Sequence, residues 1–157
     1  MTRLNLRRLL RLGLAWALLA AGVAAHAQDL LMVRSREQFP EAMVTLQDSI
    51  RSHGYTLSRV QRVDIGLTRS GFKTDKYRVV FFGKDKEIER LTAKHPELIP
   101  YLPLKVAIFA ENDQTLLVAS NPAQFERFFP DSDLVPVFQR WEKDLHAILD
   151  DVRNANN

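Results

Sequence analysis

The last quarter of the chain carries the feature that most restricts its fold, an apolar stripe repeating at helical spacing. The stripe consists of Leu134, Val137, Phe138, Trp141, Leu145, Ile148, Leu149 and Val152. This spacing places the side chains on one face of a helix, and Asp133 stands where a capping residue is expected. Such a helix must bury its stripe against a second layer of structure. We expect residues 153–157, at the end of the chain, to form a flexible tail.

Upstream apolar and alternating segments predict strands that would supply this second layer. The predicted strands are Asp29–Arg34, Tyr55–Val63, Tyr77–Gly83, Leu104–Glu111 and Gln114–Ser120. The third of these is apolar almost throughout, which predicts a central strand covered on both faces. Asn112 and Asp113 separate the last two strands by the spacing of a tight hairpin.

Helical patterns alternate with these strands. A helix is predicted over Pro40–His53, with Gly54 as its left-handed cap. A short helix is expected over Lys84–Lys94, capped by Asp85, and another over Ala123–Phe128, whereas polar residues 68–76 predict a loop. The chain is therefore expected to be an α+β two-layer sandwich of β-α-β4-α order, with about five strands and helices on one face.

The N-terminus has the three blocks of a secretory signal peptide. Arg3, Arg7, Arg8 and Arg11 precede the apolar run 12–24, and Ala25-His26-Ala27 follows it. The pattern predicts a signal peptide over residues 1–27, cleavage between Ala27 and Gln28, and one α+β domain over residues 28–152. Two alternatives remain. One is an uncleaved anchor, although the apolar run is shorter than the ~20 residues of a bilayer span. The other is twin-arginine export through Arg7-Arg8, but the neighbouring leucines favour the general secretory route.

Export would place the domain in the periplasm or outside the cell, with no membrane span after cleavage. Four of the 22 Lys and Arg residues lie in the predicted signal, which leaves 18 against 19 Asp and Glu, a net charge of about −1. A nucleic-acid partner is not expected from this balance. The chain has no cysteine, which excludes disulfides, a thiol nucleophile and a lipoprotein anchor.

Several of these blocks resemble a known family. They are the helical segment Ser35–Gly54, Val63-Asp64-Ile65, the strand Tyr77–Gly83, the block Leu102–Phe109, and Asn121-Pro122. Together, from Leu31 to Val152, they resemble the bacterial domain-of-unknown-function family 302. The resemblance implies a compact β-α-β4-α two-layer fold that tends to form homodimers, and it implies no activity. Many members carry cysteine after the Leu-Pro pair, where this chain has Leu104, so no thiol-based role is expected.

Candidate chemical groups are few. No Gly-x-Ser-x-Gly elbow is present, and no catalytic residue, metal or cofactor is predicted. His95, Tyr101 and His146 are the candidates for holding a cofactor such as haem. His146 and Asp150 lie four residues apart, which makes half of a metal site; the favoured interpretation is a solvated pair.

Two hypotheses for function follow. The first is a non-enzymatic envelope domain of unknown biochemical function that forms a homodimer. A small apolar ligand is a further candidate partner. This hypothesis depends on the absent catalytic patterns and on aromatic residues in connectors, namely Tyr101, Phe128 and Phe129. The alternative is a periplasmic enzyme, or a protein that handles metal, haem or a small ligand, which requires His95, Tyr101 and His146 to converge on one cleft.

Overall fold

The computed structural model describes residues 29–130 and 133–155. The predicted signal peptide and its cleavage site therefore lie outside the described residues. Within them, five strands form one antiparallel sheet in the order β1-β5-β4-β3-β2. The strands are β1 (Leu30–Ser35), β2 (Thr56–Arg62), β3 (Tyr77–Gly83), β4 (Leu104–Glu111) and β5 (Gln114–Ser120).

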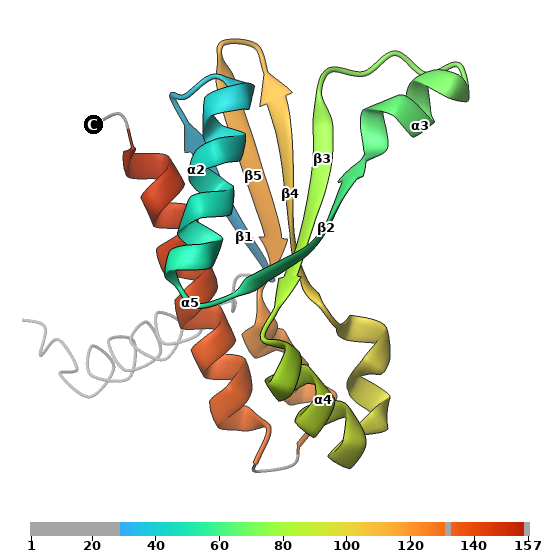
Figure 1. The fold of residues 1–157 in the computed structure, drawn as a ribbon, viewed down its shortest axis with the longest axis vertical. Coiled ribbons are helices and arrows are strands. Elements are labelled where there is room, and N and C mark those ends of the chain that lie inside the picture. Colours follow the sequence, from blue (N-terminus) through green and yellow to red (C-terminus); the bar gives the residue numbers. More distant parts are fainter. Residues whose placement is uncertain (1–28, 131–132, 156–157) are drawn as a thin grey trace, which may run out of the picture.

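Two long helices, α2 (Phe39–Ser52) and α5 (Val135–Asn154), lie side by side against one face of this sheet (Figure 1). Three short helices gather at one end of the sheet: α4 (Asp85–Lys94), η1 (Pro96–Tyr101) and η2 (Pro122–Arg127). α3 (Val63–Arg69) projects from the other end, beyond β2 and β3. This arrangement confirms the predicted α+β sandwich with helices on one face of the sheet.

The core lies between the sheet and the two long helices. β3 and β4 contribute Val80, Phe82, Val106 and Ile108, all completely buried. The predicted stripe of α5 faces them and is buried along its length, with Val137 partly buried. Burial of this apolar surface is the main force that holds the two layers together.

The end of α2 confirms the predicted glycine cap. Gly54 has a φ of 77°, in the left-handed region. Its N–H donates to the carbonyl of Arg51 at 2.9 Å, and the N–H of Tyr55 donates to that of Ile50 at 3.1 Å. This pair of bonds is the Schellman motif, which satisfies carbonyls that the helix end leaves free.

Two predicted caps are wrong. Lys84 occupies the N-cap of α4, so Asp85 is its first helical residue. Leu134 occupies the N-cap of α5, and the carboxylate of Asp133 instead contacts Lys94 and His95. In both cases the acidic residue stands one position away from the N-cap, an offset within the usual error of a sequence-based boundary.

Between β2 and β3, where the sequence predicted only a loop over residues 68–76, the chain forms a helix, α3. Asp64 in its first turn accepts the N–H of Ile65 at 2.9 Å and also pairs with Arg78 of β3. No described residue of α3 is buried, so the segment has no strong apolar periodicity from which to predict a helix.

The coverage predicted for β3 is also wrong. Its alternate residues Tyr77, Val79 and Phe81 are only partly buried, because the long helices lie on the opposite face of the sheet. No helix within residues 29–130 and 133–155 combines the length and the apolar character needed to cross a membrane.

Candidate functional site

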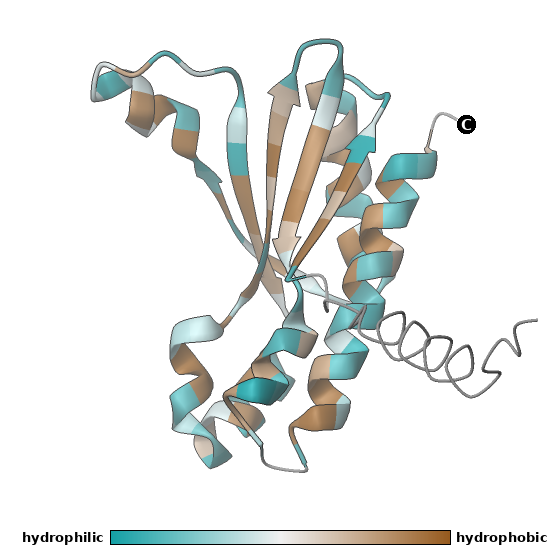
Figure 2. Cartoon of the chain, turned by 180° about the vertical axis from the view of Figure 1, so that it is seen from behind, coloured by the Kyte–Doolittle hydropathy of each residue, from teal (hydrophilic) through white to brown (hydrophobic). Residues whose placement is uncertain are grey.

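The face of the sheet that points away from α2 and α5 is apolar. Strand register places on it the residues that alternate with the core: Leu30, Met32, Tyr77, Val79, Phe81, Ala107, Phe109, Leu116 and Val118. We call these nine residues the open sheet face. Figure 2 shows it from behind, with apolar strands and no helix of the described chain over them.

Charged side chains stand at the margins of the open sheet face. At one end, Arg34 Nε donates to Glu111 Oε2 at 2.7 Å. At the other end, Arg59 and Lys105 are cross-strand neighbours of Phe81. On the edge strand β1, Leu30 and Met32 are 47% and 48% exposed. An exposed apolar surface with a charged margin is typical of an interaction site.

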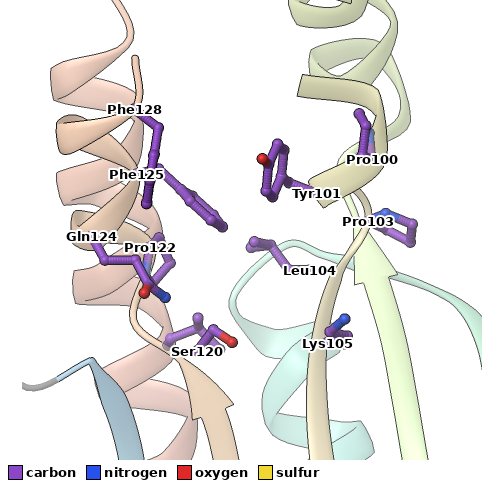
Figure 3. A pocket seen from close by; sticks show the side chains of 11 residues that line it. Pro100, Tyr101, Pro103, Leu104, Lys105, Ser120, Pro122, Gln124, Phe125 and Phe128 are labelled. Atoms are coloured by element: carbon purple, nitrogen blue, oxygen red, sulfur yellow. The ribbon is translucent and has the colours of Figure 1, made fainter. Parts of the chain in front are cut away.

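A second surface, which we call the aromatic pocket, lies between η1 and η2. Its volume is about 310 Å³. Tyr101 of η1 and Phe125 of η2 line it with their rings in contact, Phe128 stands at one end, and Lys105 and Ser120 lie at the other (Figure 3). The pocket therefore has aromatic walls and one polar end.

Local sequence fixes both walls of the pocket. Pro96 begins η1 and Pro122 begins η2, at helix positions where a missing N–H costs nothing. Asn121 caps η2, because its Oδ1 accepts the N–H of Ala123 at 2.9 Å. The same side chain donates from Nδ2 to Glu142 Oε1 at 2.7 Å, which ties η2 to α5.

The aromatic rings extend from the pocket into the core. The centroids of Tyr101 and Phe125 lie 5.1 Å apart, and Phe125 contacts Phe138 at 5.7 Å. Phe138 in turn contacts Trp141 at 5.8 Å. Tyr101 and Phe128 remain 45% and 67% exposed. The aromatic wall of the pocket is therefore packed against the core on one side and open to solvent on the other.

Lys105 is the one charged side chain among the described residues that line the pocket. It has no ion-pair partner within the described ranges, and no carboxylate lines the pocket there. Lys105 and Ser120 also border a hollow on the open sheet face. The two surfaces therefore meet at these two residues.

The three predicted cofactor candidates are placed differently from one another. Tyr101 lines the aromatic pocket. His95 is only 7% exposed and lies between two carboxylates, Glu97 Oε1 at 3.3 Å from its Nδ1 and Asp133 Oδ2 at 3.1 Å from its Nε2. Hydrogen bonds from Lys94 and then from His95 lower the pKa of Asp133 to about 2.

His146 is exposed on α5 and does not line the aromatic pocket. Asp150, its predicted partner, pairs with Arg153 at 2.9 Å instead. No group of three His, Asp or Glu side chains in the described part of the chain is arranged to hold a metal ion. The structure thus brings Tyr101 into a pocket without either histidine.

Sequence reasoning missed the open sheet face, Phe125 and Lys105. A signal for the face was present, since Tyr77, Val79 and Phe81 are apolar at positions where a half-covered strand carries polar residues. For Lys105 no signal exists, because its place in the pocket depends on where η2 packs.

Comparison with known proteins bears on the same region. The family model described as Domain of unknown function DUF302 matches residues 31–152. The chain belongs to this family. The match agrees with the resemblance found in the sequence, and the matched segment includes the aromatic pocket and all of the open sheet face except Leu30.

The crystal structure of an uncharacterized conserved DUF302 protein from Bacillus stearothermophilus is similar, with a TM-score of 0.74 and 21% sequence identity. The similarity covers 81% of this chain and 100% of that chain. At this identity it shows that the two share the DUF302 fold. A comparison with curated proteins finds no match.

Proposed function

We propose that this protein is an exported, non-enzymatic interaction domain of the cell envelope that works as a homodimer through its open sheet face. The observation that carries the proposal is an apolar sheet surface over which no helix of the described chain lies. In water such a surface is costly, by about 25 cal/mol for each Å² of apolar area. A second copy of the same face would remove it from water on both copies at once.

The size of the face can be compared with that of known interfaces. The nine residues lie on four strands, which are about 4.8 Å apart and about six residues long and so make a surface of roughly 400 Å² on each copy. A stable interface buries about 800 Å² per partner. The projecting segment around α3 supplies further apolar surface, since Phe72, just after it, is 63% exposed. The face thus supplies about half of the area that a stable interface buries, and this segment adds to it.

The margin of the face supports the same reading. Arg34, Glu111, Arg59 and Lys105 lie at its ends and leave the centre without charge. Interfaces commonly have this arrangement of apolar centre and polar rim, because a central charge would be desolvated without compensation. The predicted signal peptide supports the envelope as the compartment in which the dimer acts.

Sedimentation equilibrium of the protein expressed from its full sequence tests the dimer. We expect a dimer at tens of micromolar, and we expect Met32→Glu to raise the dimer dissociation constant at least tenfold, since it buries a charge in the interface. Val44→Glu is the matched control, because Val44 is 58% exposed on α2, away from the open sheet face. It should leave the constant unchanged.

Two results would contradict the proposal. One is a monomer at every concentration up to about 100 µM. The other is a dimer that Met32→Glu and Val44→Glu weaken equally, which would place the contact elsewhere. Both residues are about half exposed, so neither substitution should unfold the chain.

A further inference from the structure

We propose that the aromatic pocket is a binding site for a small amphipathic carboxylate, with the apolar part of the ligand packed against the rings of Tyr101, Phe125 and Phe128 and its carboxylate at Lys105. This inference does not rest on the proposed dimer. It assigns a ligand chemistry to the aromatic pocket, which borders the proposed dimer interface only at Lys105 and Ser120.

The walls define the apolar part of the ligand. Tyr101, Phe125 and Phe128 present ring surface to the pocket, and Leu104 and Leu145 also line it. The volume of about 310 Å³ is at the lower end of the range for small-molecule sites. It suits a chain of about eight carbons or a single aromatic ring.

The polar end defines the charge of the ligand. The ammonium group of Lys105 has no ion-pair partner among the described residues, and the neighbouring Ser120 and Gln124 can donate hydrogen bonds. No described carboxylate lines the pocket, so an anion meets attraction and no repulsion there. A cationic ligand would be repelled by Lys105 and would find no carboxylate to pair with among the described lining residues.

The supporting contacts make the pocket a preformed one. Asn121 fixes η2 to Glu142 of α5 at 2.7 Å. Tyr101 is held by two rings, Phe125 at 5.1 Å and Phe129 at 5.5 Å between centroids. A ligand therefore loses little affinity to ordering the site.

Titration with three eight-carbon probes, followed by ¹H–¹⁵N NMR on the protein expressed from its full sequence, tests the proposal. Octanoate should bind with a dissociation constant of about 1 mM or tighter and shift resonances of the residues around Tyr101 and Phe125. Octanamide should bind more weakly, and octylammonium should bind weakest of the three.

Two pairs of variants locate the ligand. Lys105→Met keeps the apolar stem and removes the charge, so it should weaken octanoate binding about fivefold and leave octanamide binding unchanged. Lys73→Met, at an exposed lysine in the loop after α3, is its control. Phe128→Ala should weaken both probes about equally, whereas Phe72→Ala, at a similarly exposed ring, should weaken neither.

Equal binding of octanoate and octylammonium would overturn the proposal, as would shifts confined to another surface. Binding to phosphatidylglycerol vesicles without binding to octanoate would also overturn it, since the site would then serve a membrane surface. The Met32→Glu variant should retain octanoate binding. A protein that binds octanoate as a monomer would therefore contradict the homodimer and leave this inference standing.

Discussion

Gly83 at the end of β3 shows how a single residue sets the junction between the sheet and the short helices. A Cβ at this position would lie 2.3 Å from Ile88 Cδ1 of α4 and 3.7 Å from Pro103 Cβ. Glycine therefore allows a close approach here, because a Cβ would require the Ile88 side chain to change its rotamer or α4 to shift. The position matters for the pocket, since Pro103 lines it.

We expect Gly83→Ala to lower the free energy of unfolding by about 1–3 kcal/mol, the usual cost of overpacking. Urea denaturation followed by circular dichroism measures it. Adding Ile88→Val removes the clashing Cδ1 and should recover part of the loss. Gly66→Ala is the control, because nothing lies within 4 Å of the added Cβ in α3; it should change stability by no more than about 1 kcal/mol. Equal effects at both glycines would contradict the steric explanation.

At the scale of elements, Asp133 links the start of α5 to the end of α4. Its Oδ2 lies 2.5 Å from Lys94 Nζ and 3.1 Å from His95 Nε2. These two hydrogen bonds, that from Lys94 first, lower the pKa of Asp133 from 3.8 to about 2. The link joins two helices whose residues are far apart in sequence, and it replaces the helix cap that the sequence predicted.

This link gives a pH dependence of stability. Because the pKa of Asp133 is lower in the folded chain, its contribution is complete above pH 4 and is lost as the pH falls from about 4 to about 2. Asp133→Asn lacks the charge. At pH 6 we expect this variant to melt at a slightly lower temperature than the original protein. The difference in melting temperature should disappear near pH 2.

Scanning calorimetry at several pH values between 2 and 6 measures this difference. Asp75→Asn is a suitable control, since Asp75 is also exposed and has no ion-pair partner in the described residues. A difference between Asp133→Asn and the original protein that stays constant across the range would show that Asp133 acts only through shape.

At the scale of the whole molecule, the two-layer fold is asymmetric, because its long helices cover only one face of the sheet. α2 and α5 cover one face of a sheet whose central strands are largely apolar on both faces. Three short helices close one end, and two of them, η1 and η2, form the aromatic pocket beside the uncovered face. Both proposed interactions therefore use surfaces created by the way the layers are stacked, and neither depends on a catalytic group.

Export is tested at the same scale. When it is expressed from its full sequence in a bacterium, the protein should be recovered from the periplasm. Its mass should be that of a chain whose first residue is Gln28. Ala27→Leu places a larger residue at the cleavage position and should make the uncleaved chain accumulate. Ala24→Leu, which leaves both small positions intact, should be processed normally. A periplasmic protein that retains residues 1–27 would favour the uncleaved anchor.

The sequence by itself determined the kind and order of most elements. Strand and helix periodicities are local properties of the chain, so β3, the β4–β5 hairpin, the buried stripe of α5 and the cap at Gly54 could be predicted from neighbouring residues. Membership in the DUF302 family could be inferred in the same way, because its blocks are continuous in sequence.

Only the tertiary structure decided which surfaces stay open. The apolar residues of β3 predicted coverage on both faces, yet the packing of both long helices on one side leaves Val79 and Phe81 partly exposed. Tyr101 meets Phe125, and Lys105 lies beside Ser120, because η1, η2 and the sheet pack together. Contacts between distant segments depend on how whole layers pack, and no local spacing of residues encodes that arrangement.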